Sequence, residues 1–232
     1  MSNSEKKEDA KSAQDFRNLG SKLVLGMHLI HDTIGIALNM ELQKQSEILI
    51  IGGGGGKELS TLSKYSKEWQ FTVVDPSEKM IQLAGYWVEK EQIGDRTKLL
   101  KGYLEDFHLR KASFNAITCI AVLHYLDRNG RQNIFKAVKK LLKPKGVFVW
   151  TVAVKPETSQ ELNYLKRLYF QFPRQNGVDV SVINSMKDSI QQKYKLMTSD
   201  EELEMIKSIG FNNRIEIGST TLFKTYIFRN NN

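Results

Sequence analysis

Short apolar runs alternate with amphipathic segments along the middle of the chain, and this alternation limits the possible folds more than any other feature. The runs predict strands at residues 47–51, 71–75, 98–101, 115–121 and 146–154. They are continuously apolar, as expected of parallel strands that are buried on both faces. Strands that alternate with helices are typical of βαβ units, so the sequence predicts a mostly parallel sheet covered on both sides.

Apolar stripes at helical spacing predict the helices between these strands. One stripe follows Ser77, a suitable N-cap, and comprises Met80, Leu83, Ala84, Trp87 and Val88. A second stripe lies at residues 134–142 and is stopped by Pro144 and Gly146.

The last fifth of the chain predicts one more helix and two more strands. Thr198 to Glu201 fits a capping box, and Gly210 would close the helix that it opens. Strands are then expected at residues 212–217 and 221–228. The expected fold is a Rossmann-like, doubly wound α/β sheet of about seven strands, mostly parallel with an antiparallel last strand.

Two helical segments lie outside the alternation, at residues 16–45 and 155–197. No linker divides the chain, so residues 16–232 are expected to form one domain after a flexible tail at residues 1–15. The segment 155–197 follows the fifth strand at the edge where ligands bind in such sheets, and its apolar face should end at Pro173 and Gly177. We interpret it as a candidate lid, with extra packing as the alternative.

Composition restricts the compartment and the partners. The single cysteine, Cys119, excludes an internal disulfide and a zinc cluster, and we expect no metal. No signal peptide or membrane-length apolar run is present, so a cytoplasmic protein without a membrane partner is expected, as a monomer or homodimer. The net charge of +8 would suit nucleic acid, but the densest lysines, at residues 136–145, are typical of a solvated helix end.

Five glycines, Gly52 to Gly56, follow the first predicted strand. A turn without Cβ atoms lets a nucleotide-like ligand approach the backbone closely. A P-loop would need glycine at Ile51 and a hydroxyl at Glu58, and a dinucleotide fingerprint would need glycine at Lys57 or Glu58. What remains is a Gly-x-Gly-x-Gly turn at positions 52, 54 and 56.

Asp75 ends the second predicted strand, twenty-three residues after Gly52. That separation is close to the roughly 20 residues at which a carboxylate reaches ribose hydroxyls in such folds. The alternative is an ordinary acidic residue before a helix, stabilised by the helix dipole.

Together these segments resemble the class I S-adenosylmethionine (SAM) dependent methyltransferases over most of residues 47–228. The resemblance is carried, in order, by residues 48–56, 74–80, 102–106, 117–126 and 141–149. It implies a methyltransferase whose cofactor is SAM, with a loop under the methionine part, a ribose acid, an adenine-edge segment and a strand end that flanks the cofactor. The implied cofactor-binding residues are Gly52, Gly53, Gly54, Gly56, Asp75, Pro76, Met80, Leu104, Glu105, Asp106, Ile120 and Ala121.

The chain departs from the family pattern at two positions. Many members carry an acid in the first strand that helps to orient the amino-acid end of SAM, and this chain has Ile50 there. The Ile-Ile-Gly-Gly-Gly form instead resembles aminopropyltransferases, but their acidic motif after the fourth strand is replaced by Ala121 to Tyr125. Tyr103 occupies a position that is often an adenine-contacting Asp.

Methyl transfer depends mainly on positioning, and a base helps when the acceptor is a hydroxyl or a protonated amine. His124 is the candidate base and Tyr125 a candidate for the acceptor pocket, with simple packing as the alternative for His124. His28 and His31 are more typical of surface or packing residues. We expect a small-molecule acceptor with an N or O nucleophile; the alternatives are an RNA methyltransferase and a non-catalytic SAM-binding partner subunit.

Overall fold

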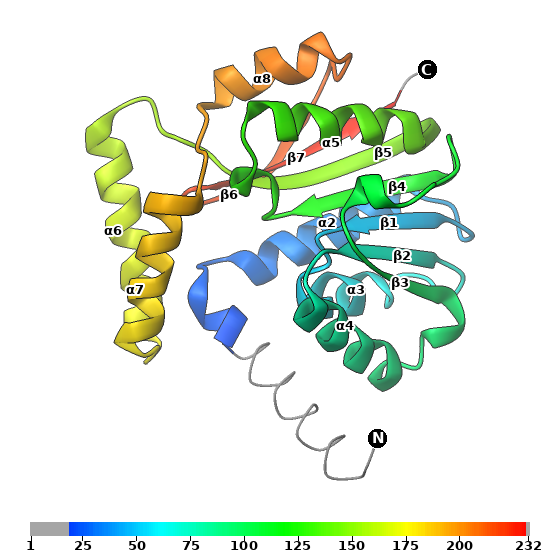
Figure 1. The fold of residues 1–232 in the computed structure, drawn as a ribbon, viewed down its shortest axis with the longest axis horizontal. Coiled ribbons are helices and arrows are strands. Elements are labelled where there is room, and N and C mark those ends of the chain that lie inside the picture. Colours follow the sequence, from blue (N-terminus) through cyan, green and yellow to red (C-terminus); the bar gives the residue numbers. More distant parts are fainter. Residues whose placement is uncertain (1–18, 231–232) are drawn as a thin grey trace.

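Seven strands form one twisted sheet in the computed structural model, which describes residues 19–230 (Figure 1). The expected tail at residues 1–15 lies outside the described residues. The sheet order is β3-β2-β1-β4-β5-β7-β6, with β7 antiparallel to both of its neighbours. This confirms the expected fold class. The strands are β1 (Glu47–Ile51), β2 (Gln70–Asp75), β3 (Thr97–Lys101), β4 (Phe114–Ile120), β5 (Leu142–Ala153), β6 (Ile215–Thr220) and β7 (Phe223–Arg229).

Helices cover both faces of the sheet (Figure 1). On one face lie α2 (Met27–Glu41), α3 (Lys57–Leu62) and α4 (Glu78–Lys90), and on the other lie α5 (Arg128–Leu141) and α8 (Ser199–Ser208). Because side chains alternate along a strand, Ile48 and Ile50 pack toward α2 and α3, whereas Leu49 and Ile51 pack toward α5 and α8. None of the helices in the described part of the chain is long and apolar enough to span a membrane.

The predicted helix caps are present. The Ser77 hydroxyl accepts a hydrogen bond from the Met80 N–H at the start of α4. At the start of α8 the Thr198 hydroxyl accepts from the Glu201 N–H, and the Glu201 carboxylate accepts from the Thr198 N–H at 2.7 Å. Local sequence therefore determines where these helices begin.

Two predicted boundaries were wrong. β5 begins at Leu142, directly after α5, because a register shift opposite Phe114 and Ala116 lets the strand include Pro144 and Gly146. Pro173 does not end its helix, since α6 (Ser159–Gln175) continues for two residues beyond it. A proline in the last turn removes few of the helix's hydrogen bonds.

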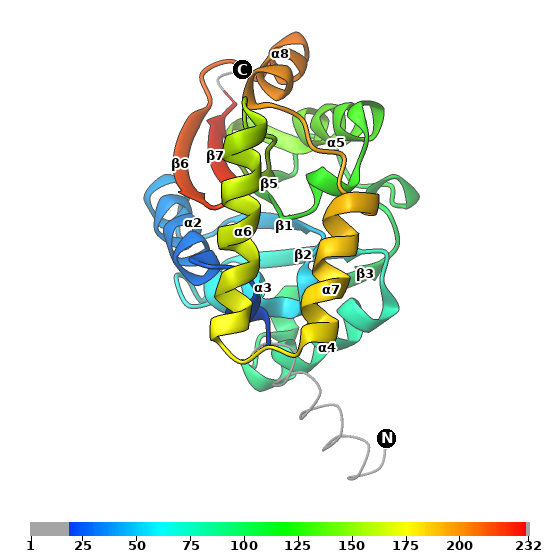
Figure 2. The ribbon, with the colours of Figure 1, turned by 90° about the vertical axis from the view of Figure 1, so that its left-hand side faces the viewer.

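The segment at residues 155–197 folds into α6 and α7 (Val180–Asp188), followed by a π-helical turn (Ser189–Lys193). Figure 2 shows the two helices side by side in front of the edge where the parallel strands end. Tyr169 of α6 and Ile190 of the π-helical turn belong to an apolar cluster with Phe223 of β7, against which Val24 and Met27 near the start of α2 also pack. The segment therefore braces the wall that the N-terminal helix forms.

Candidate functional site

A cavity of about 1680 Å³ opens at the carboxyl ends of β1, β2 and β4. Ile51, Asp75 and Ile120, which end or nearly end these strands, all lie in its wall. Chain order reverses here, because β1 is flanked by β2 on one side and β4 on the other, and ligands bind at such switch points. Pockets for a single small ligand measure roughly 300–1000 Å³, so the cavity has room for two small molecules.

The glycine loop forms the floor of this cavity. A Cβ atom on Gly52, which has a φ of +71°, would lie 2.3 Å from the Val122 side chain. On Gly53 it would lie 2.2 Å from Val73. Neither position admits a side chain, so bare backbone faces the cavity, as close contact with a ligand requires.

One of the predicted loop glycines that the structure describes does not border the cavity. Gly56, with a φ of +83°, lies against α4, where a Cβ atom would be 3.0 Å from the Ala84 Cα. Gly55, which the prediction omitted, is part of the cavity wall, and the surroundings of Gly54 lie outside the described part of the structure. Gly56 is therefore required for helix packing rather than for contact with a ligand.

Asp75 lies in the cavity wall at the end of β2, next to the glycine loop. Its side chain is buried, and Oδ1 accepts a hydrogen bond of 2.9 Å from the Ser77 N–H. Pro76 and Met80 line the same wall. The carboxylate is thus held in a fixed position beside the loop, as the ribose prediction requires.

Residues after β3 and β4 complete this half of the cavity. Leu104, Glu105, Ile120 and Ala121 line it. Asp106 does not, since its Oδ2 accepts a 2.7 Å hydrogen bond from the Tyr103 N–H and closes the turn locally. Of the three residues predicted to border the adenine, Leu104 and Glu105 therefore lie in the cavity wall, and the exposed Tyr103 lies beside them.

Of the two candidate catalytic residues, only Tyr125 reaches the cavity. His124 is 1% exposed and packs against Tyr194 and Phe223 behind the wall. Its Nδ1 lies 3.4 Å from the Ala153 N–H, which donates to it. Burial, together with the nearby Arg131, lowers the pKa of His124 to about 3. This position argues against a base role, and the packing alternative describes it better.

The histidines of α2 are the ones that border the cavity. His28 and His31 both line it, near Met27. The His31 Nδ1 lies 2.8 Å from the Met27 carbonyl oxygen, which only accepts, so Nδ1 carries the hydrogen and Nε2 keeps its lone pair. Burial lowers the pKa of His31, and the charge of Lys57 lowers it further. His31 is therefore a neutral imidazole that can accept a proton.

Glu58, in the first turn of α3, is a cavity-lining residue that sequence reasoning missed. It is 5% exposed, and burial raises its pKa to about 7, with the Thr118 hydroxyl acting in the opposite direction. The available signal was an acidic residue immediately after a glycine loop.

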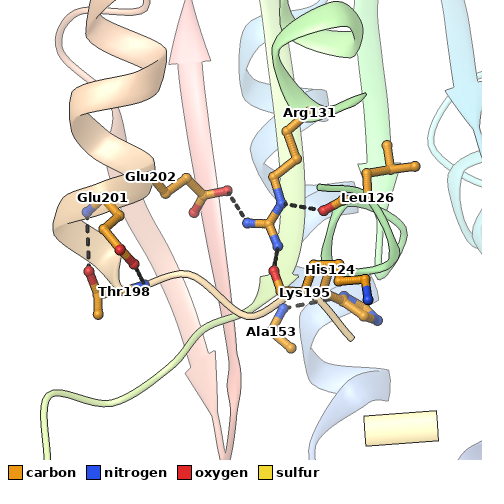
Figure 3. Close-up of polar contacts among 8 residues, drawn as sticks. All are labelled: His124, Leu126, Arg131, Ala153, Lys195, Thr198, Glu201 and Glu202. Atoms are coloured by element: carbon orange, nitrogen blue, oxygen red, sulfur yellow. Dashed lines mark hydrogen bonds and ion pairs between the residues drawn. The ribbon is translucent and has the colours of Figure 1, made fainter. Parts of the chain in front are cut away.

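A buried arginine joins three segments of the chain (Figure 3). Arg131 of α5 donates to the Leu126 carbonyl at 3.2 Å and to the Lys195 carbonyl at 2.5 Å. Its third nitrogen lies 3.7 Å from a Glu202 oxygen in α8, within ion-pair range but too far for a hydrogen bond. The Lys195 N–H in turn donates to the His124 carbonyl at 2.7 Å. These contacts attach the end of the 155–197 segment to the residues that follow β4.

No group of three or more His, Cys, Asp or Glu side chains within residues 19–230 is arranged to hold a metal ion.

The chain is similar in sequence to known proteins over most of its length. Residues 48–146 match the family profile described as a methyltransferase domain. The chain is 23% identical over 201 residues to the carboxy-S-adenosyl-L-methionine synthase of Pseudoalteromonas atlantica, covering 86% of this chain and 82% of the relative. It is 24% identical to the enzyme of the same name from Staphylococcus epidermidis, covering 86% of each.

Solved structures show the same fold. A protein of Methanococcus maripaludis assigned as a SAM-dependent methyltransferase superposes with a TM-score of 0.63 at 15% identity. The match covers 98% of this chain and 94% of the other. The correspondence therefore extends to the helical segments at both ends of the sheet.

Proposed function

We propose that the chain is a class I SAM-dependent methyltransferase, in line with the methyltransferase-domain profile that residues 48–146 match, and that it transfers the methyl group of SAM to a nitrogen or oxygen nucleophile of a small molecule. The observation that carries this proposal is the continuity of the cavity. The same cavity borders the glycine loop and Asp75 at one side and His28, His31 and Tyr125 at another. A cofactor and an acceptor would thus lie in contact.

The first half of the cavity fits SAM. The bare backbone at Gly52 and Gly53 gives close access to the methionine part, and the fixed carboxylate of Asp75 can accept hydrogen bonds from ribose hydroxyls. Leu104 and Glu105 would border the adenine. When bound, SAM supplies an electrophilic methyl group.

The second half would bind the acceptor. Tyr125 and His28 are polar side chains exposed to the cavity, and His31 is a neutral imidazole in the same wall. A base of this kind can remove the proton from a hydroxyl or an ammonium nucleophile. Enclosure by α2, which the 155–197 segment braces, would exclude water and favour a small acceptor.

The test is product formation by the purified chain. SAM is incubated with panels of amines, phenols, carboxylates and transfer RNA, and S-adenosylhomocysteine (SAH) and the methylated acceptor are measured by mass spectrometry. Transfer to a small molecule is expected. Transfer to RNA alone would support the nucleic-acid alternative, SAM binding without any product would support the non-catalytic one, and no SAM binding would contradict the proposal.

Synthesis of carboxy-SAM is a second candidate, favoured by the names of the curated relatives that the chain matches over most of both lengths. That reaction adds the elements of CO₂ to the sulfonium methyl group and requires a carboxyl donor. Its product is a heavier sulfonium compound, whereas methyl transfer yields SAH. The same mass spectra, recorded with small carboxylic acids present, distinguish the two.

A further inference from the structure

Glu58 is a buried carboxyl group for which the fold provides too few partners. Its side chain lies in the cavity wall, and Oε1 has no hydrogen-bond partner. None of the ion pairs among the described residues includes it. Because burial of an unpaired carboxylate is costly, an unsatisfied acid that borders a cavity indicates a cationic ligand group.

The position of Glu58 in the sheet suggests which group this is. Thr118 of β4 pairs in register with Ile50 of β1, and the Thr118 hydroxyl is close enough to Glu58 to lower its pKa. The carboxyl group therefore lies over the junction of β1 and β4, beside the position where the resemblance leads us to expect a strand-one acid and Ile50 provides none. Left-handed Gly55 and Gly56 turn the chain so that α3 begins immediately below the loop.

We propose that the Glu58 carboxylate binds the ammonium group of the methionine part of SAM. An acid in the helix after the glycine loop thus takes the role of the strand-one acid that this chain lacks. This inference rests on the proposed use of SAM. It assigns Glu58 to cofactor recognition rather than to the transfer step.

The surroundings of Glu58 are suited to this exchange. Burial raises its pKa to about 7, so that near neutral pH the free protein holds a proton on Glu58 part of the time. The other titratable groups nearby are Lys57 on the same helix, His31 on α2 and the Cys119 thiol on β4, whose pKa is also raised by burial. An arriving ammonium would stabilise the carboxylate and release that proton.

The test compares two nucleosides that differ in the amino-acid part. SAH carries the ammonium and carboxylate, whereas methylthioadenosine lacks both. In titration calorimetry, Glu58→Gln should weaken SAH binding about tenfold to a hundredfold, as expected for loss of a charge-assisted hydrogen bond. It should leave the affinity for methylthioadenosine unchanged. Asp75→Asn is the matched control, because loss of the ribose acid should weaken both nucleosides alike.

Equal losses for both nucleosides in Glu58→Gln, or no loss for either, would overturn the assignment of Glu58 while SAH binding by the unaltered protein still supported the proposed function. If the unaltered protein bound neither nucleoside, the proposed function would fail together with the assignment.

A second measurement needs no variant. At pH 7, titrations in buffers of different ionisation enthalpy should show that SAH releases part of a proton on binding and that methylthioadenosine releases none. Proton uptake, as expected if His31 responded to the SAH carboxylate instead, would contradict the proposal.

Discussion

At the scale of single residues, the burial of Glu58 makes the stability of the fold depend on pH. Burial raises its pKa from 4.5 to about 7, so between these pH values the unfolded chain loses a proton that the folded chain keeps. The contribution of Glu58 to the unfolding free energy is therefore fully present below pH 4.5. It is lost as pH rises to about 7, and the protein stays less stable above that pH. The difference corresponds to about 3 kcal/mol.

Replacing Glu58 by Gln should remove this pH dependence. We expect the unfolding free energy of Glu58→Gln, relative to the unaltered protein, to rise by about 3 kcal/mol between pH 4.5 and pH 8. Urea unfolding across this pH range measures the difference. Glu105→Gln, an exposed acid on the same cavity, serves as control and should show no such rise. A difference that does not grow with pH would contradict the interpretation of Glu58 as a buried acid without an ion-pair partner.

His31 gives a second prediction at this scale. As the proposed base, it must be neutral, and its lowered pKa keeps it so until the pH falls below its usual value of 6.5. With the best small acceptor, His31→Gln should reduce kcat about 10²-fold to 10⁴-fold and abolish the acidic limb of the kcat/KM profile. SAH affinity should not change.

His108 is the matched control for His31, because it lines the same cavity but follows β3 in the chain and is not part of α2. His108→Gln should retain both the rate and the acidic limb. A full rate in His31→Gln would sink the base role and leave positioning as the remaining contribution of this wall.

At the scale of elements, Arg131 decides how α5, α8 and the end of the 155–197 segment fit together. Its guanidinium is 1% exposed and contacts two backbone carbonyls as well as Glu202. The pKa of Glu202 is raised because burial outweighs the attraction of Arg131 and Arg214. Both Glu202 oxygens lack hydrogen bonds, so the pair is an imperfect one.

The two partners should therefore respond differently to substitution. Arg131→Met should lower the unfolding free energy by about 3 to 5 kcal/mol, because it leaves a buried acid and two carbonyls without a partner. Glu202→Gln should lower the unfolding free energy far less at pH 8. Relative to the unaltered protein, this variant should become more stable as pH rises, because the raised pKa of Glu202 means that its charged form destabilises the folded state. Urea unfolding of both variants at pH 6 and pH 8 measures this. Equal losses for the two variants would contradict it.

At the scale of the whole molecule, the cavity is assembled from parts that are distant in the chain. The Thr220 hydroxyl at the end of β6 donates to the Leu25 carbonyl at 2.6 Å, just before α2. The pair α6 and α7 supports the same region through Val24 and Met27. Among the described residues, none after 141 lines the cavity, so the later part of the chain shapes it by positioning α2. A lid role for residues 155–197 stays a prediction.

The sequence by itself determined the strands β1 to β4, the capped helices, the glycine turn and the placement of Asp75. These depend on local periodicity, capping residues and the spacing between neighbouring elements, all of which can be read along the chain. The switch point followed, because the carboxyl ends of successive parallel strands must meet at one edge.

Only the tertiary structure decided which acid-base groups reach the cavity. His124 follows β4 as predicted, but its side chain packs against Phe223. His31 lies in the cavity wall because α2 contacts β6 and its start packs on the apolar cluster that includes Tyr169 of α6. Glu58 contacts Thr118, which is sixty residues away in the sequence and pairs with Ile50, the position where the strand-one acid is missing. Burial and partners depend on such distant neighbours, and no local pattern encodes them.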